Sequence, residues 1–306
     1  AWNCPWSLVL GSLSFSHLSL VLETKDKGPR TKDNITNEAR MRNARWILLM
    51  AVASGCAANN VAESRKELQA GYQSLKEQDY DSAMAQSEQF LREHPNGGPG
   101  TPEALYLQGR VYEQRAATAD AAGREQDARS DLQYARGNYE HALTLQPTPR
   151  LEALLYAGIA NVAYFQEDYA AAMQQWAQAY TGLDGADSKA WVLYRIGLCQ
   201  QRLGRFEQAD RSFATVRQQF PSTIPGQRAA SHMGARAFYV QIGAYGDAAN
   251  ADRAVASLRS QGLAAAKAVD ATGRQAVRVG PASTYADAKA LKTRLAVAYP
   301  AAIIEP

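Results

Sequence analysis

The C-terminal part of the chain alternates between strand-like and helix-like patterns of hydrophobic residues. From Phe238 to Tyr245 apolar and polar side chains alternate and β-forming residues dominate, as in a half-buried strand. Apolar residues then recur at helical spacing from Ala251 to Leu258, ahead of Gly262. Further strand-like runs occupy residues 264–269, 276–279 and 302–304, with a second helical stretch before the last of them. The predicted order is therefore strand, helix, strand, strand, helix, strand.

This order predicts a small α+β domain with the ferredoxin-like βαββαβ plan. In the first strand, alternation places Val240 and Ile242 on one face of the sheet and Tyr239, Gln241 and Gly243 on the other. Helices cover only one face of such a sheet. We therefore expect the apolar set to lie beneath the helices and the polar set to face outward.

The third predicted strand has the same two-sided pattern. Val277 and Val279 share one face, opposite Ala276 and Arg278. The valines are expected beneath the helices, so that Arg278 joins Gln241 on the outward face.

Two motifs in these strands point to a known family. The first strand reads YVQIGAY from Tyr239 to Tyr245, and the third ends in VRVGP from Val277 to Pro281. They resemble the opening strand and a later strand end of the SPOR domain, a module that binds peptidoglycan in bacterial envelopes. The resemblance covers residues 236–306. It implies binding to glycan strands that have lost their stem peptides.

On that resemblance, the outward face of the sheet binds glycan. An amide, a guanidinium and tyrosine rings match the hydroxyl groups, acetamido groups and apolar faces of sugars. The plainer alternative for the amide and the guanidinium is that they are solvated strand residues. The candidate peptidoglycan-binding residues are Tyr239, Gln241, Tyr245 and Arg278.

Four other positions in this region qualify the expectation. Ala244 stands where family members often have serine, and Ala276 stands where arginine is common. Each change removes a potential hydrogen bond worth about 1 kcal/mol, so glycan binding is expected to be weaker or to depend more on Arg278 and the tyrosines. Gly280 and Pro281 are expected to serve turn geometry only.

Residues 63–235 show a helical pattern that repeats at a period near that of the tetratricopeptide repeat. The clearest unit runs from Leu193 to Pro221 and has small residues at Gly197 and Ala209, with the bulky Phe213 beyond them. Small residues at such positions let paired helices approach closely. Three earlier units have matching residues: Gly71, Tyr80, Ala83 and Pro95; Gly109, Ala135, Tyr139, Ala142 and Pro147; Tyr156, Ala160, Tyr169, Ala172, Trp176 and Ala179. The fold class predicted for the whole chain is mainly α, a TPR helical solenoid, followed by the small α+β domain.

The first helix of each repeat is expected to line a concave, protein-binding groove. Tyrosine, tryptophan and arginine commonly anchor protein partners. The alternative is that several of these residues only pack between neighbouring repeats. The candidate groove residues are Tyr106, Arg110, Asn161, Tyr164, Trp191, Tyr194 and Arg202. Cys199 lies within an apolar helical stretch and is expected to be a small core residue.

The segment 41–56 resembles a bacterial lipoprotein signal peptide. Met41 opens a short basic stretch, an apolar run follows, and Ser54-Gly55-Cys56 completes a lipobox. On this interpretation residues 1–40 are a non-native upstream extension. The alternative is that Trp6 to Leu22 forms a short membrane segment.

Cys56 is the expected lipidation site. Three acyl chains on this residue would exceed the two signals that stable membrane anchoring needs. Ala57, in place of an aspartate, favours sorting to the outer membrane, and residues 57–62 would form a short tether. The alternative is an ordinary secretory signal in which Cys56 is incidental.

The composition argues against several other classes of function. A net charge of +3 is too near balance to predict a nucleic-acid partner. The three cysteines and four histidines have no ligand spacing, so neither a metal site nor a cofactor is expected. The chain has no HExxH-like pair and no Gly-rich phosphate loop, so we expect no enzyme activity. Acidic helix residues such as Glu113, Glu167 and Asp168 are expected to be solvated.

These patterns predict a non-enzymatic, lipid-anchored scaffold on the periplasmic side of the outer membrane, with septal localisation. It would bind peptidoglycan glycan strands through residues 236–306, and envelope or division proteins through residues 63–235. No Pro/Gly/Ser-rich linker separates Met233 from Phe238, which predicts a fairly fixed relation between the two domains. One alternative is an assembly factor for outer-membrane proteins that the SPOR domain only localises. A less favoured alternative is a wall hydrolase.

Overall fold

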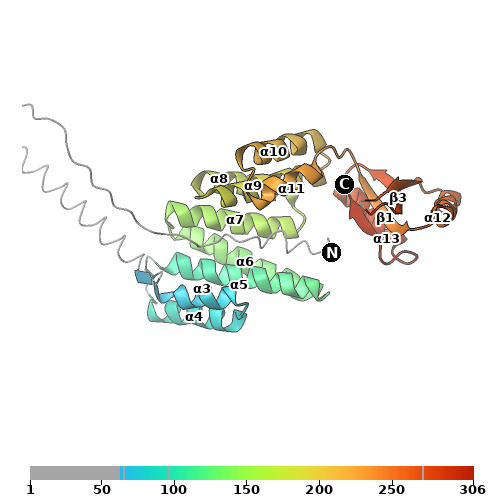
Figure 1. Cartoon of the computed structure of the whole chain (residues 1–306). Helices are drawn as coiled ribbons and strands as arrows, with labels where there is room; N and C mark the ends of the chain where they lie inside the picture. Colours follow the sequence, from blue (N-terminus) through green and yellow to red (C-terminus); the bar gives the residue numbers. More distant parts are fainter. Residues whose placement is uncertain (1–62, 65, 96, 99, 271) are drawn as a thin grey trace, which may run out of the picture. The chain divides into compact units, whose positions relative to one another are not determined.

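The computed structural model describes residues 63–306 except 65, 96, 99 and 271 (Figure 1). The expected upstream extension over 1–40, the signal peptide over 41–56 with Cys56, and the tether over 57–62 lie outside the described residues. The chain divides into two compact units, one ending at Leu151 and the other spanning Glu152–Pro306. Within the described part of the chain, no helix combines the length and apolar character needed to cross a membrane.

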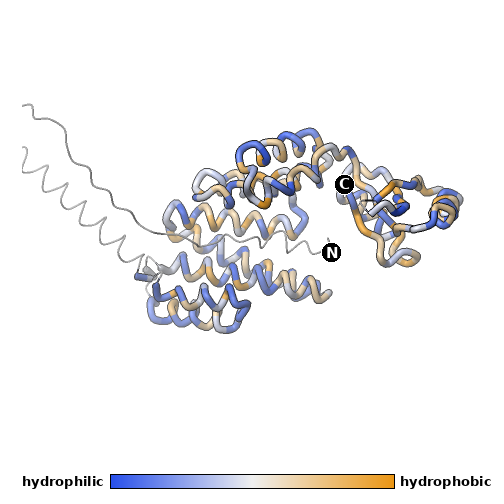
Figure 2. Tube along the Cα trace, viewed as in Figure 1, coloured by the Kyte–Doolittle hydropathy of each residue, from blue (hydrophilic) through white to orange (hydrophobic). Residues whose placement is uncertain are grey.

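The described residues of the first unit contain two helix pairs, α3 (Gln69–Lys76) with α4 (Tyr80–Glu93), and α5 (Thr101–Ala121) with α6 (Glu125–Thr144). Asp79 starts α4, because its carboxylate accepts a hydrogen bond from the backbone N–H of Ser82. Figure 2 shows hydrophobic and hydrophilic residues interspersed along each helix, as expected of helices that bury one face. The shared core is formed by Leu68, Leu75, Ala83, Phe90, Ala104, Leu107 and Val111.

Helix α7 (Pro149–Phe165) leads into the second unit. It is followed by α8 (Tyr169–Gly182), α9 (Ala186–Arg202) and α10 (Phe206–Gln219). Two short elements, α11 (Ile224–Arg228) and the 3-10 helix η1 (Ala229–His232), then pack against α9 and α10. Paired helices therefore occupy the region where the repeats are predicted.

Glycines on the first helix of a pair allow bulky residues of the second helix to pack against its backbone. A Cβ added to Gly197 in α9 would lie 2.7 Å from the Phe213 ring of α10. A Cβ added to Gly109 in α5 would collide with the Tyr139 ring of α6. These contacts confirm the predicted pairing of small and bulky residues.

The C-terminal domain has the predicted element order. It consists of β1 (Phe238–Tyr245), α12 (Ala248–Ser260), β2 (Ala265–Val269), β3 (Gln275–Ala282), α13 (Tyr285–Leu295) and β4 (Ile303–Glu305). The strands form an antiparallel sheet in the order β2-β3-β1-β4. This order confirms the ferredoxin-like plan.

One face of this sheet carries the hydrophobic core. Val240 and Ile242 of β1 pack with Val277 and Val279 of β3, as the alternation predicts. Helix residues complete the core from the same side: Ala251, Val255 and Leu258 of α12 and Leu295 of α13. The other face of the sheet carries polar residues together with small alanines.

The expectation that Gly280 and Pro281 form a turn is wrong. Strand β3 continues through them to Ala282, which pairs with Phe238 of β1. The register between the two strands shifts by one residue here. Gly280 has a φ of 149°, a conformation that a glycine adopts readily.

Candidate functional site

The outward face of the sheet brings together three of the four predicted glycan-binding residues. Gln241 of β1 is paired with Arg278 of β3, and both lie opposite the valine core. Tyr239 lies two residues before Gln241, on the same face. All three side chains are partly exposed.

Glu305 is a fourth member of this face and was not among the residues predicted from the sequence. It pairs with Tyr239 across β1 and β4, and its carboxylate lies 2.7 Å from the Arg278 guanidinium. With its amide nitrogen turned toward β4, Gln241 donates to both Glu305 oxygens, at 3.2 and 3.3 Å. The period of two within 303–305 was the signal that could have placed Glu305 on this face.

Tyr245 does not belong to this face. A second register shift between Gln241 and Gly243 sets two β1 residues opposite one β3 residue, so that Gly243 pairs with Val277. The shift turns Gly243 and Tyr245 toward the helices, and the Tyr245 ring packs against the hydrophobic core. The predictions that Gly243 faces outward and that Tyr245 is available to glycan are therefore wrong.

Small residues surround the polar cluster on the outward face. Ala244 pairs with Ala276, and Ala276 with Ala268 of β2. Arg278 also pairs with Ala266. Ala276 has no exposed surface, so its methyl group packs within the sheet.

The predicted groove residues in the first unit belong to a buried network. Tyr106 is 1% exposed, and its hydroxyl accepts a hydrogen bond from Arg110 at 3.4 Å. Arg110 also lies 3.8 Å from the carboxylate of Glu113, to which Tyr139 donates at 2.8 Å. Burial raises the pKa of Tyr106 and of Tyr139. The expectation that Glu113 is solvated is wrong, because its side chain lies inside this network.

The predicted groove residues in the second unit are also packed inside it. Asn161, Tyr164, Trp191 and Tyr194 are buried. Asn161 accepts a hydrogen bond from Arg195 at 3.1 Å, and the Tyr194 hydroxyl lies 2.7 Å from Nε2 of His232. Packing between helices, the alternative for these residues, is what the structure shows. Because these four side chains are buried, they are not available to line an open groove.

Arg202 joins the last repeat to the C-terminal domain. Its guanidinium lies 4.7 Å from the ring centre of Tyr164, 5.1 Å from that of Tyr169 and 4.4 Å from that of Tyr285 in α13. It also donates to the Tyr169 hydroxyl at 2.8 Å. Such stacking is worth about 0.5–2 kcal/mol per ring, more where the cation is shielded from water. The prediction that Arg202 points into a groove is therefore wrong.

Apolar packing and an ion pair add to this junction. The rings of Phe206 in α10 and Phe238 in β1 pack at 5.6 Å, and both belong to a buried cluster with Ala282 and Ala288. Glu167, expected to be solvated, forms an ion pair with Lys289 of α13.

Asp210 reinforces the connection between the two domains. It accepts a hydrogen bond from the backbone of Gly234 at 2.9 Å and forms an ion pair with Arg236 at 2.8 Å. The short connection after η1 is thus held by a side chain of the last repeat.

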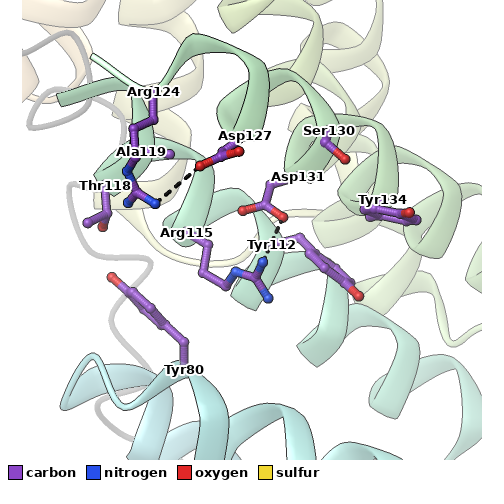
Figure 3. Close-up of a pocket in the computed structure, with 10 residues that line it drawn as sticks. All are labelled: Tyr80, Tyr112, Arg115, Thr118, Ala119, Arg124, Asp127, Ser130, Asp131 and Tyr134. Carbon is purple, nitrogen blue, oxygen red and sulfur yellow. Dashed lines mark hydrogen bonds and ion pairs between the residues drawn. The ribbon is translucent and has the colours of Figure 1, made fainter. Parts of the chain in front are cut away.

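A polar pocket of about 440 Å³ lies over α5 and α6 of the first unit (Figure 3). Tyr112 and Tyr134 stack at 5.2 Å, and the Arg115 guanidinium lies 5.3 Å from the Tyr112 ring. Arg115 pairs with Asp131 at 3.1 Å, and burial raises the pKa of Asp131. Tyr134 is 57% exposed. The pocket thus offers an accessible aromatic ring beside a guanidinium.

The described residues offer little for other chemistry. They contain no group of three or more His, Cys, Asp or Glu side chains placed to hold a metal ion. Cys199 is fully buried, as predicted, and burial raises the pKa of its thiol to about 12.

Comparison with known protein families agrees with this architecture in two places. Residues 234–304 match the SPOR domain, and residues 191–223 match the tetratricopeptide repeat. No curated protein matches the chain. Both matched domains are non-catalytic; the SPOR domain implies peptidoglycan binding in the periplasm or cell wall, and the repeat implies protein interactions. The chain thus contains a tetratricopeptide repeat followed by a C-terminal SPOR domain.

Proposed function

We propose that the protein is a non-enzymatic scaffold that binds peptidoglycan glycan, stripped of its stem peptides, through the outward face of its SPOR sheet. The observation that carries this proposal is the convergence of Tyr239, Gln241 and Arg278 on the helix-free face of a domain that matches the SPOR family. The small side chains of Ala244 and Ala266, which are at least partly exposed, leave room beside them for a flat sugar ring. The amide and the guanidinium supply hydrogen bonds to hydroxyl and acetamido groups.

Retention on purified cell-wall sacculi tests this proposal. The purified protein should be retained on sacculi treated with an amidase. Gln241→Glu should lower retention about tenfold, because a second carboxylate would face Glu305 and the amide donor would be lost. The matched control is Gln261→Glu, the same change at an exposed position after α12. Equal retention of the two variants would contradict glycan binding at the outward face of the sheet.

The helical region supplies the proposed protein-binding surface. Because most of the predicted groove residues are buried, we place the contact at the pocket with Tyr112, Arg115 and Tyr134. Exposed aromatic and arginine side chains are frequent anchors of protein interfaces.

Site-specific photo-crosslinking in cells tests this surface and identifies the partner class. A crosslinker at Tyr134 should capture a defined protein, and one at the exposed Gln133 side chain should serve as the neighbouring reference. Division and wall enzymes would support the scaffold. Capture of a barrel-assembly complex would favour the alternative, an outer-membrane assembly factor that the SPOR domain localises.

Membrane attachment at Cys56 is part of the same proposal. The lipobox ending at Cys56 supports lipidation and delivery to the periplasmic side of the outer membrane. Radiolabelled palmitate should enter the wild type and not the Cys56→Ala variant. Label in both proteins would contradict lipidation at this residue.

Two observations in cells and on sacculi separate this role from the remaining alternative. A fluorescent fusion should form rings at the septum, where denuded glycan accumulates. Incubation of the purified protein with sacculi should release no soluble muropeptides. Release of muropeptides would instead support a wall hydrolase.

A further inference from the structure

The Arg278 side chain already holds a carboxylate, and that carboxylate comes from the chain itself. Glu305 Oε2 lies 2.7 Å from Arg278 Nη2, a short charge-assisted contact. The two side chains are 29% and 28% exposed, so the pair is partly shielded from solvent and partly accessible to it. The outward face can therefore accommodate a carboxylate on Arg278.

The Arg278 guanidinium retains unused donor capacity beside this contact. Its Nε is buried and has no hydrogen-bond partner. A guanidinium presents five N–H donors in a planar fork that matches a carboxylate through two parallel bonds. The contact between Nη2 and Glu305, with Nε unpaired, leaves that fork incompletely used.

The acidic partner, Glu305, lies on the shortest described strand of the sheet. Strand β4 has three residues and pairs only with β1 among the described strands. Its register places Glu305 opposite Tyr239, next to the Gln241 and Arg278 pair. A rotation of the Glu305 side chain toward solvent would free Arg278 without moving the core.

The proposed glycan ligand gains a carboxylate in the same reaction that removes its stem peptide. When the amide bond between muramic acid and its stem peptide is hydrolysed, the lactyl group of the sugar is left as a free carboxylate. Intact strands carry an amide at that position. A guanidinium that binds a carboxylate beside the sugar ring would therefore distinguish denuded glycan from intact glycan.

We propose that Arg278 recognises the lactyl carboxylate of denuded glycan, and that Glu305 is an internal competitor occupying Arg278 until the ligand displaces it. The inference rests on the proposed function, because it assumes that glycan binds to this face. In the exchange, the ligand carboxylate replaces that of Glu305 and the number of ion pairs is conserved. Glu305 thus lowers the affinity and restricts binding to ligands that bring a carboxylate of their own.

The test compares denuded glycan strands with the same strands after their lactyl carboxylates are converted to amides. The wild type should bind the amidated strands about tenfold more weakly. Glu305→Gln should bind unmodified denuded strands about fivefold more tightly, because the competitor is neutral. Arg278→Gln should bind both kinds of strand weakly and equally.

The double variant Arg278→Gln/Glu305→Gln controls for folding, since it removes the pair without leaving one unmatched charge. It should unfold at a temperature near that of the wild type and bind both strands equally. Equal wild-type binding to acidic and amidated strands, or no gain in Glu305→Gln, would overturn the inference. Failure of the wild type to bind either strand would overturn the proposed function itself.

Discussion

The guanidinium of Arg202, at the end of α9, lies 4.4 Å from the ring centre of Tyr285, the first residue of α13. This contact joins the last helix pair to the SPOR domain. Phe206 and Phe238 pack together beside it, and all four residues fall within one compact unit. We infer that residues 152–306 behave as one body, in which the last repeats and the SPOR domain keep a fixed relation.

Replacing Arg202 should loosen that junction. Arg202→Met keeps the apolar stem but removes the cation that stacks on Tyr285, and should destabilise the unit by about 1–3 kcal/mol. Limited proteolysis should then cut between His232 and Phe238 faster than in the wild type. Arg205→Met, at an exposed neighbouring position, is the control and should leave the cleavage rate unchanged. If both variants resist protease as the wild type does, the junction does not depend on Arg202.

Replacing glycine by alanine should have opposite effects on stability at two positions of the first unit. Gly109→Ala places a methyl group against the Tyr139 ring and should destabilise the unit by about 1–3 kcal/mol. Gly137→Ala lies on α6 with open space around it and should stabilise by about 0.5–1 kcal/mol. Urea unfolding of both variants measures the difference. If both variants are destabilised by a similar amount, the close contact between α5 and α6 does not require glycine at position 109.

The second unit should lose stability in mild acid through His232. Burial lowers the pKa of this residue to about 4, with help from the positive charges of Arg202 and Arg228. The unfolded chain takes up this proton near pH 6.5, so between about pH 6.5 and 4 the unfolded state binds more protons and stability falls as the pH drops. From pH 7 to pH 4.5 the wild type should lose about 1–3 kcal/mol more than His232→Gln.

Urea unfolding at both pH values gives this difference, because carboxylates titrate alike in the two proteins. Loss of stability that is identical in wild type and His232→Gln would show that the histidine is not responsible.

The β-bulge in β1 should separate the roles of two tyrosines. Tyr239→Ala should weaken retention on denuded sacculi by about threefold to tenfold, through loss of an aromatic surface on the outward face. Tyr245→Phe preserves the packing of a ring that faces the core and should leave retention unchanged. A marked loss of binding in Tyr245→Phe would instead place its hydroxyl at the ligand.

Cys199 should not react while the second unit is folded. Its thiol is fully buried and its pKa is raised to about 12, so almost no thiolate forms at pH 8. Mass spectrometry after iodoacetamide treatment should find Cys199 unmodified in buffer and modified in urea. Rapid labelling in buffer would mean that α9 opens readily.

The sequence by itself determined the order of elements and the composition of the core. Alternation in β1 and β3 predicted that Val240 and Val279 are buried while Gln241 and Arg278 face outward. Small residues at helical repeat positions predicted close helix pairs, as Gly197 and Phe213 confirm. These features follow from periods of 2 and 3.6 residues, which are properties of the local chain.

Only the tertiary structure decided which of the outward-looking residues are accessible and what each one contacts. The bulge after Gln241 reverses the face of Tyr245, and helix packing buries Tyr106 and Trp191, which the repeat pattern had placed in a groove. The pairing of Arg278 with Glu305 joins residues on different strands. A period fixes the direction of a side chain relative to its own element. Burial and partners depend on register shifts and on the elements that pack opposite, and these are set by contacts between residues far apart in the sequence.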